Sequence, residues 1–318
     1  MFVVIVNPMD YIKIYEVGPR DGLQNEQTPI ATPQKKWLVD GLVQAGLKHI
    51  ELTSFVHPKY VPQMADADAM MAYAAQTHHD SDTQFIGLVF NQRGYDRAIA
   101  NGCNSMAFGV AVSETFSQEN TRMSPARALE ITRDLVAQAR RDGVWTRVYL
   151  MTAWVCPFEG PINPWRTVSL AERIWELGID ELAVADTIGH AHPLEVGSLM
   201  EELGKRLGMN RLAVHLHDTQ AIGLANATTA LQAGVRIFDS SIGGLGGCPF
   251  APGAAGNLAT EDLVHLCYKM GIGTGVDFNQ LWDIVHEMET WVTRPVGGRI
   301  RAWWESVCAT KPNLTFDT

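Results

Sequence analysis

The 318-residue sequence lacks several features that mark whole classes of proteins. It has no run of about 18 apolar residues, the length that a membrane-spanning helix needs, and no basic stripe of the kind that nucleic-acid-binding proteins carry. Its formal net charge is −10. We therefore expect no membrane and no nucleic acid among its partners. Its five cysteines are odd in number and form no C-x-x-C pair, which favours a reduced, cytoplasmic protein over a disulfide-rich one.

Short apolar runs alternate with helical patterns along most of the chain. Eight predicted strands, each followed by a predicted helix, cover residues 11–17, 48–55, 83–89, 103–110, 144–152, 179–184, 210–216 and 235–240. This alternation predicts a parallel sheet, and eight such units predict an α/β fold, the closed (β/α)8 TIM barrel. An open, doubly wound sheet is the alternative, but no G-x-G-x-x-G follows the first strand.

Helix signals set the expected domain limits. In the first predicted helix, residues 32–46, Thr32 is the expected N-cap and Pro33 the first helical residue. Residues 1–275 are expected to form the barrel domain. Residues 276–318 lie beyond the eighth unit and are expected to form a C-terminal helical extension, packed on the barrel or on a partner subunit.

Two histidines alternate with apolar residues in the segment RLAVHLHDT (211–219). Residues two apart on a strand face the same side of a sheet, so His215 and His217 are expected to lie together. Two neutral imidazoles make half of a divalent-metal site. The alternative is a pair of hydrogen-bonded core histidines. Because TIM barrels hold their chemistry at the C-terminal ends of the strands, this position favours the metal.

Charged residues follow three other predicted strands. Asp21 can supply a carboxylate oxygen to a metal ion, and the planar guanidinium of Arg20 suits a carboxylate or an enolate oxygen. The alternative for this dipeptide is a surface ion pair in a turn. Glu51 and Asp186 end the second and sixth strands and could be structural. For Asp186 we expect either contact with a substrate hydroxyl or support of another residue.

A glycine-rich segment, SIGGLGGCPFAPGAAGNLATED (241–262), follows the eighth strand. Eight of the residues from Gly243 to Gly256 are glycine or proline, which predicts a mobile lid instead of a helix or strand. Cys248 lies in its middle and is expected to act as an acid or base, although a buried structural cysteine is the common case. Asn257 is expected either to cap the next helix or to complete the metal site.

Six segments together resemble the 3-hydroxy-3-methylglutaryl-CoA lyases, a branch of the barrel metalloenzymes that include isopropylmalate and homocitrate synthases. The resemblance extends over about residues 12–290. The glycine-rich cysteine loop after an H-x-H strand is specific to the lyase branch. The segments are EVGPRDGLQNE (16–26), SFVHPKYVPQMAD (54–66), CPFEG (156–160), ADTIG (185–189), AVHLHDT (213–219) and GLGGCPFAPGAAGNLATEDLV (244–264).

The resemblance implies an acyl-CoA substrate and a reaction. The substrate is 3-hydroxy-3-methylglutaryl-CoA or a close 3-hydroxyacyl-CoA analogue, cleaved by retro-Claisen chemistry to acetyl-CoA and acetoacetate. The resemblance also implies Mg²⁺ or Mn²⁺ as cofactor and a homodimer. The metal ligands that it implies are Asp21, His215, His217 and Asn257.

The same resemblance implies the roles of the other site residues. Arg20 would bind substrate and stabilise the thioester enolate, and Glu51 matches a family position near it. Cys248 would be the mobile proton donor. Asp186 would lie near the tertiary hydroxyl, and Gln24 would contact substrate.

Other functions remain open from the sequence. One is a Claisen-type acyl-CoA condensing enzyme, and another is a non-catalytic barrel with a structural metal. The chain also departs from the family pattern, which leaves the identity of the acyl chain open. The departures are bulky side chains at Trp154 and Val155, replacements at Gly243 and Phe250, and the extra histidines His190 and His192.

Overall fold

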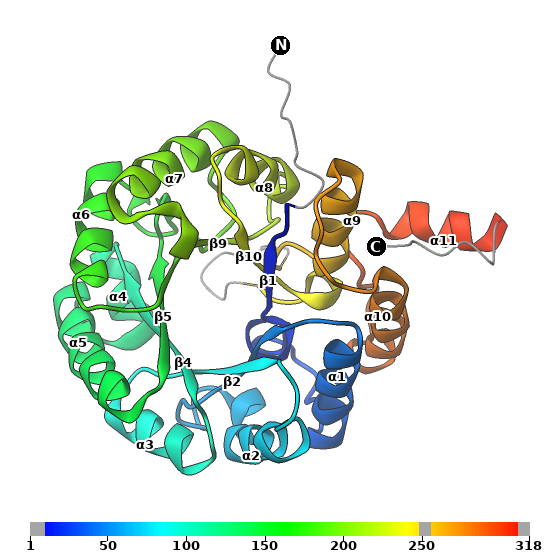
Figure 1. Cartoon of the computed structure of the whole chain (residues 1–318), viewed down its shortest axis with the longest axis horizontal. Coiled ribbons are helices and arrows are strands. Elements are labelled where there is room, and N and C mark those ends of the chain that lie inside the picture. Colours follow the sequence, from blue (N-terminus) through cyan, green and yellow to red (C-terminus); the bar gives the residue numbers. More distant parts are fainter. Residues whose placement is uncertain (1–9, 248–255, 311–318) are drawn as a thin grey trace.

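The computed structural model describes residues 10–247 and 256–310, and the structural statements below concern these residues. Eight parallel strands close into a barrel in the order β1-β10-β9-β8-β5-β4-β3-β2, with helices around it (Figure 1). The predicted TIM barrel is confirmed. The strands are β1 (Lys13–Glu16), β2 (His49–Ser54), β3 (Gln84–Leu88), β4 (Ser105–Ala111), β5 (Trp145–Met151), β8 (Glu181–Asp186), β9 (Leu212–Leu216) and β10 (Ile237–Ser240).

Helices follow the barrel strands, as the sequence pattern predicts. Helix α4 (Glu114–Thr121) was not predicted, because Phe116 is its one buried large apolar residue and gives no helical period. The short hairpin of β6 (Val155–Cys156) and β7 (Gly160–Pro161) was not predicted either. The expected helices are α1 (Thr32–Gln44), α2 (Ala67–Thr77), α3 (Gln92–Ala100), α5 (Pro125–Asp142), α6 (Pro164–Trp175), α7 (Pro193–Leu207), α8 (Gly223–Gln232) and α9 (Thr260–Met270).

Two helix starts differ from the sequence expectations. Ala31 is the N-cap of α1 and Thr32 is already helical, so the expected Thr32 cap is wrong. The Thr32 hydroxyl instead donates to Asp66 Oδ2 at 2.8 Å, and the Gln34 side chain accepts from the Ala31 amide. Helix α9 begins at Thr260, which leaves Asn257 outside its cap and excludes a capping role for this residue.

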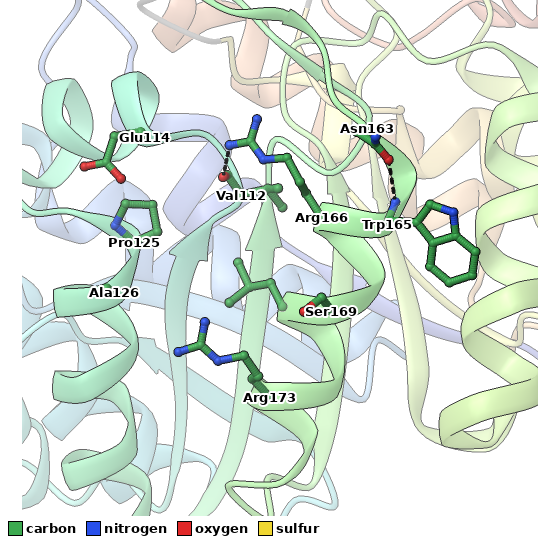
Figure 2. A pocket seen from close by; sticks show the side chains of 10 residues that line it. Val112, Glu114, Pro125, Ala126, Asn163, Trp165, Arg166, Ser169 and Arg173 are labelled. Carbon is green, nitrogen blue, oxygen red and sulfur yellow. Dashed lines mark hydrogen bonds between the residues drawn. The ribbon is translucent and has the colours of Figure 1, made fainter.

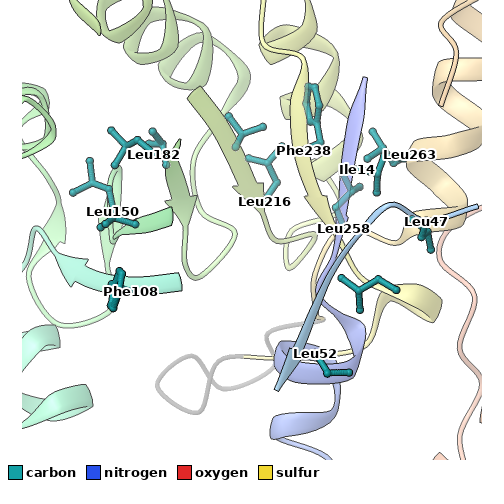
Figure 3. Close-up of a cluster of buried hydrophobic side chains, with 14 of the residues drawn as sticks. Ile14, Leu47, Leu52, Phe108, Leu150, Leu182, Leu216, Phe238, Leu258 and Leu263 are labelled. Carbon is teal, nitrogen blue, oxygen red and sulfur yellow. The ribbon is translucent and has the colours of Figure 1, made fainter. Parts of the chain in front are cut away.

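Strand alternation divides the core into an outer and an inner part. Side chains such as Phe108, Leu150 and Leu182 belong to the large apolar cluster between strands and helices (Figure 3). A smaller cluster, with Tyr15 and Tyr149 among its members, fills the barrel interior. Inward positions on β5 therefore alternate with the outward Val148 and Leu150 of the same strand.

The C-terminal extension consists of α10 (Phe278–Val292) and α11 (Arg301–Thr310). Helix α10 packs on α1, where the Trp291 ring meets Trp37 edge-on at 5.4 Å between centroids. Helix α11 extends outward from the barrel (Figure 1), and its Trp304 is buried 5.1 Å from the ring of Phe278. Within the described residues, no helix has the length and apolar character to cross a membrane.

Candidate metal centre and active site

Three potential metal ligands meet at the C-terminal mouth of the barrel. His215 lies on β9, His217 follows directly after it, and Asp21 lies in a π-helical turn, Gly18–Gly22, after β1. One ligand atom from each of these side chains lies within 4.8 Å of the others. The two imidazoles face each other with their Nε2 atoms 3.1 Å apart, and both rings are buried. The structure thus brings together three of the four proposed ligands in one cluster.

The surroundings of the histidines suit metal binding. The Asp239 carboxylate lies 3.0 Å from His215 Nδ1. Because an ionised carboxylate can only accept, His215 Nδ1 carries a proton, and Nε2 is the ring nitrogen that faces the site. Burial, with the neighbouring His215, lowers the pKa of His217 to about 3, so this imidazole is neutral at pH 7. Neutral imidazole nitrogens are the form that binds divalent metals.

Asp21 is held ionised by its neighbours. Burial opposes its ionisation, but the charge of Arg20 and the hydrogen bond from Asn257 help to lower the pKa of Asp21 to about 2. Arg20 Nη1 donates to Asp21 Oδ1 at 2.5 Å, and Asn257 Nδ2 donates to Oδ2 at 2.8 Å. The site therefore contains a fixed negative charge next to the facing ring nitrogens of His215 and His217.

The turn that carries Asp21 depends on Glu16, the last residue of β1. Glu16 Oε1 accepts from the amides of Gly18 at 2.7 Å and Ile242 at 2.8 Å, which joins the loops after the first and last strands. A Cβ on Gly18 would lie 2.5 Å from that oxygen, so glycine is required there. Burial raises the pKa of Glu16 to about 7 despite these donors.

Asn257 contributes the fourth proposed donor. It lies beside His217 in an isolated antiparallel bridge and is 3% exposed. Its amide nitrogen also donates to the Leu245 carbonyl at 3.0 Å. Its Oδ1 is buried and has no hydrogen-bond partner among the described residues. Such an orphaned oxygen is costly to bury, so the donor set of two imidazole nitrogens, one carboxylate and one amide oxygen fits a divalent cation.

Arg20 is fixed between two carboxylates. Its Nε donates to Glu51 Oε1 at 2.5 Å, while Nη1 contacts Asp21. Burial alone would lower the pKa of Arg20, but Glu51 and Asp21 raise it above its ordinary value. The guanidinium is therefore a permanent cation placed beside the cluster of potential metal ligands.

A buried polar network that the sequence analysis missed lies beneath these residues. The Tyr149 hydroxyl donates to Glu51 Oε2 and accepts from Arg147 Nη1 at 3.1 Å. Arg147 Nη2 donates to Asp239 Oδ1 at 2.6 Å, and its Nε lies 2.9 Å from Glu181 Oε1. A signal was present, because the segments WTRVYLM and IFDS place a charged residue within otherwise apolar or uncharged strands.

Asp186 ends β8 but turns its oxygens to the following loop. It accepts from the amides of His190 at 3.0 Å and Ala191 at 3.1 Å. Burial raises the pKa of Asp186 to about 6. In the same loop the His192 ring caps α7 by accepting from the Glu195 amide at 3.4 Å. The two extra histidines thus belong to the connection into α7.

The remaining predicted residues are placed as follows. Trp154 is buried, and its Nε1 donates to the Glu195 carbonyl at 3.2 Å, so this bulky side chain packs against the start of α7. Gln24 is partly exposed in the segment after the π-helical turn. Cys248 lies outside the described residues.

A cavity of about 540 Å³ lies outside the barrel, between the starts of α4 and α5 on one side and α6 on the other (Figure 2). Arg166 crosses its upper end and donates to the Val112 carbonyl at 3.0 Å. None of the predicted site residues lines it. Its lining residues are Val112, Glu114, Pro125, Ala126, Asn163, Trp165, Arg166, Ser169, Leu170 and Arg173.

Comparisons with known proteins cover nearly the whole chain. A family model described as HMGL-like matches residues 11–287. Hydroxymethylglutaryl-CoA lyase YngG of Bacillus subtilis (strain 168) is 40% identical over 288 residues, which span 91% of this chain and 95% of that protein.

Solved structures agree with this match. The crystal structure of an HMG-CoA lyase of Bacillus subtilis superimposes with a TM-score of 0.89 at 39% identity, covering 93% of this chain and 98% of the other. An HMG-CoA lyase of Acinetobacter baumannii, solved in complex with coenzyme A and 3-methylmalate, has a TM-score of 0.87 at 33% identity and covers 92% and 95% of the two chains.

Proposed function

The chain belongs to the HMGL-like family, and from that premise we propose that it cleaves 3-hydroxy-3-methylglutaryl-CoA to acetyl-CoA and acetoacetate. The observation that carries the proposal is the cluster of Asp21, His215 and His217 at the barrel mouth, with the fixed cation of Arg20 beside it. A hydroxyl-bearing thioester bound there would meet both a metal site and a guanidinium.

The reaction requires two proton transfers and one bond cleavage. The tertiary hydroxyl loses its proton, the bond between C2 and C3 breaks, and its electron pair forms the enolate of acetyl-CoA. C3 becomes the ketone of acetoacetate. The enolate carbon then takes up a proton, so atoms and charge balance.

We propose Mg²⁺ or Mn²⁺ as the cation, because the donors are oxygens and nitrogens with no thiolate. Asp21, His215, His217 and Asn257 would hold it. A bound cation would supply Lewis acidity that favours ionisation of the substrate hydroxyl.

The protein's own residues complete the chemistry. Arg20, oriented by Asp21 and Glu51, donates to the thioester oxygen as negative charge develops there. Asp186, with a pKa of about 6, can exchange a proton near neutral pH and is assigned to the substrate hydroxyl. Cys248 is assigned as the acid that protonates the enolate, and Gln24 as a substrate contact.

Cleavage is favoured over the Claisen-type condensing alternative. The relatives that match this chain over about nine-tenths of their length are named as lyases. The two activities leave different products, because condensation releases free CoA and cleavage does not.

An assay of the purified protein separates these functions. The protein is incubated with 3-hydroxy-3-methylglutaryl-CoA and Mg²⁺ or Mn²⁺, while acetoacetate and free thiol are followed, with an EDTA-treated sample as control. Acetoacetate without free CoA is expected. In a separate reaction that supplies acetyl-CoA and a 2-oxo acid, release of free CoA would indicate condensation. No turnover on this substrate or on a panel of other 3-hydroxyacyl-CoA thioesters would reject the proposal.

We also propose a homodimer in the cytoplasm. Helix α11 extends beyond the barrel with Trp303 45% exposed, which offers a surface to a second copy. The four cysteines of the described residues are unpaired thiols, as expected in a reducing compartment. Light scattering coupled to size-exclusion chromatography gives the subunit count.

A further inference from the structure

We propose that Tyr149 and Asp239 are positioning residues that join Arg20 and His215 into one rigid unit across the barrel interior. The metal-binding part of this inference stands on geometry alone. Its catalytic part rests on the proposed function.

Asp239 fixes the His215 end of the unit. Its Oδ2 lies 3.0 Å from His215 Nδ1, and its Oδ1 accepts from Arg147 Nη2 at 2.6 Å. The pairing is built into the strands, because Asp239 of β10 stands opposite His215 of β9 in the ladder. A carboxylate at this place selects the His215 tautomer whose Nε2 lone pair points toward Asp21 and His217.

Tyr149 spans the distance from that end to Arg20. Its hydroxyl donates to Glu51, the carboxylate that holds Arg20 Nε at 2.5 Å. Its ring lies edge-on to His215, with centroids 5.7 Å apart, and the Arg20 guanidinium carbon lies 5.8 Å from its centroid. Tyr149 therefore contacts both the guanidinium side and the imidazole side of the site.

Arg147 closes the chain of contacts between these two residues. It is fully buried, donates to Tyr149 and Asp239, and forms an ion pair with Glu181 at 2.9 Å. Its guanidinium also lies 4.1 Å from the centroid of the Tyr15 ring. Hydrogen bonds and ion pairs thus run without interruption from Arg20 through Glu51, Tyr149, Arg147 and Asp239 to His215.

A competing explanation is that the network only balances buried charge. Tyr15 provides the matched control, because it is another buried tyrosine of the barrel interior. Its hydroxyl donates to Glu181 Oε2 at 3.2 Å, an acceptor that is neither Arg20 nor His215 nor a carboxylate bonded to them. Tyr15→Phe and Tyr149→Phe each remove one buried hydroxyl bonded to a carboxylate, but only the Tyr149 hydroxyl bonds to residues of the chain from Arg20 to His215.

The experiment measures Mn²⁺ affinity by calorimetry without substrate, then kcat and KM on the acyl-CoA substrate, with Tm recorded for every variant. Asp239→Asn is expected to weaken Mn²⁺ binding ~10–100-fold. Tyr149→Phe is expected to keep Mn²⁺ affinity and lower kcat ~10–100-fold, because Arg20 loses its fixed geometry. Tyr15→Phe is expected to change neither value, with a similar effect on Tm.

Two results would overturn the inference: wild-type Mn²⁺ affinity in Asp239→Asn, or the same kinetics in Tyr149→Phe and Tyr15→Phe. If Asp239→Asn does not fold, Asp239→Glu keeps the charge opposite Arg147 but displaces the carboxylate, and its Mn²⁺ affinity decides. An inactive wild-type protein would reject the proposed function and leave the Mn²⁺ comparison decisive for the positioning role of Asp239.

Discussion

Replacement of Asn257 by alanine tests whether this residue is a metal ligand or only a structural amide. The Asn257 amide nitrogen donates to Asp21 and to the Leu245 carbonyl. Two such hydrogen bonds contribute about 2 kcal/mol to the free energy of unfolding. The substitution also removes the orphaned Oδ1, whose burial without a partner costs about 1–3 kcal/mol. In metal-free protein the two effects nearly cancel, so the expected change is within about 1 kcal/mol.

Metal changes this balance. At a cation concentration 100 times Kd, binding stabilises the wild-type protein by about 2.7 kcal/mol. If loss of Oδ1 weakens binding about 100-fold, the same concentration stabilises the variant by only about 0.4 kcal/mol. The difference in the free energy of unfolding between the wild-type protein and the variant is then expected to grow by about 2.3 kcal/mol on addition of metal.

The assay is urea unfolding of both proteins in EDTA and in Mn²⁺, with the wild-type Kd measured first. Asn25→Ala is the matched control, because Asn25 also donates to a loop carbonyl, that of Gly247, but lies outside the ligand set. If Asn257→Ala changes the free energy of unfolding by the same amount with and without Mn²⁺, Asn257 is structural. The proposed ligand set would then lose its fourth member.

Three further predictions follow from the site. His217→Ala is expected to abolish turnover and weaken Mn²⁺ binding, and full activity in this variant or after chelation would remove the metal from the reaction. Cys248→Ser is expected to keep Tm and metal content but to lower kcat ~10²–10⁴-fold, the usual size of an acid–base contribution; near-normal turnover would contradict the assignment. Burial raises the pKa of Glu261 from 4.5 to about 8, so the folded state retains a proton that the unfolded state has released. Stability from this group is complete below pH 4.5 and is lost as pH rises to about 8. Glu261→Gln is therefore expected to reduce the fall in the free energy of unfolding between pH 5 and 8, as measured by urea unfolding. An unchanged fall would show that it does not originate from Glu261.

The barrel could be predicted because each of its units carries its own pattern. The apolar strands and amphipathic helices repeat eight times, and strand alternation alone puts His215 and His217 on one face. Features without such a local pattern were not predicted from the sequence. Helix α4 has one large buried apolar residue, and the cap of α1 uses Gln34 because Asp66 of another unit takes the Thr32 hydroxyl.

The interior network shows the same limit within the site. Arg147 and Asp239 are isolated charged residues in the patterns of two strands that lie 92 positions apart in the chain. Their pairing depends on barrel closure and on inward orientation at the same level, which periodicity within one strand does not give. The sequence indicates that a polar residue is present at such a position, but only the folded barrel identifies its partner.

The Glu16 contact to the amides of Gly18 and Ile242 lies where the first strand of the barrel meets the last, since β1 pairs with β10. Asp21 and Asn257, which share a hydrogen bond, come from opposite sides of this seam, and both belong to the proposed cation site. The ring must therefore close before a cation can find its full set of donors, and a nascent chain that ends before β10 cannot assemble them. Once bound, the ion would connect the loops on the two sides of this seam. Loss of the metal and separation of β1 from β10 would then be coupled.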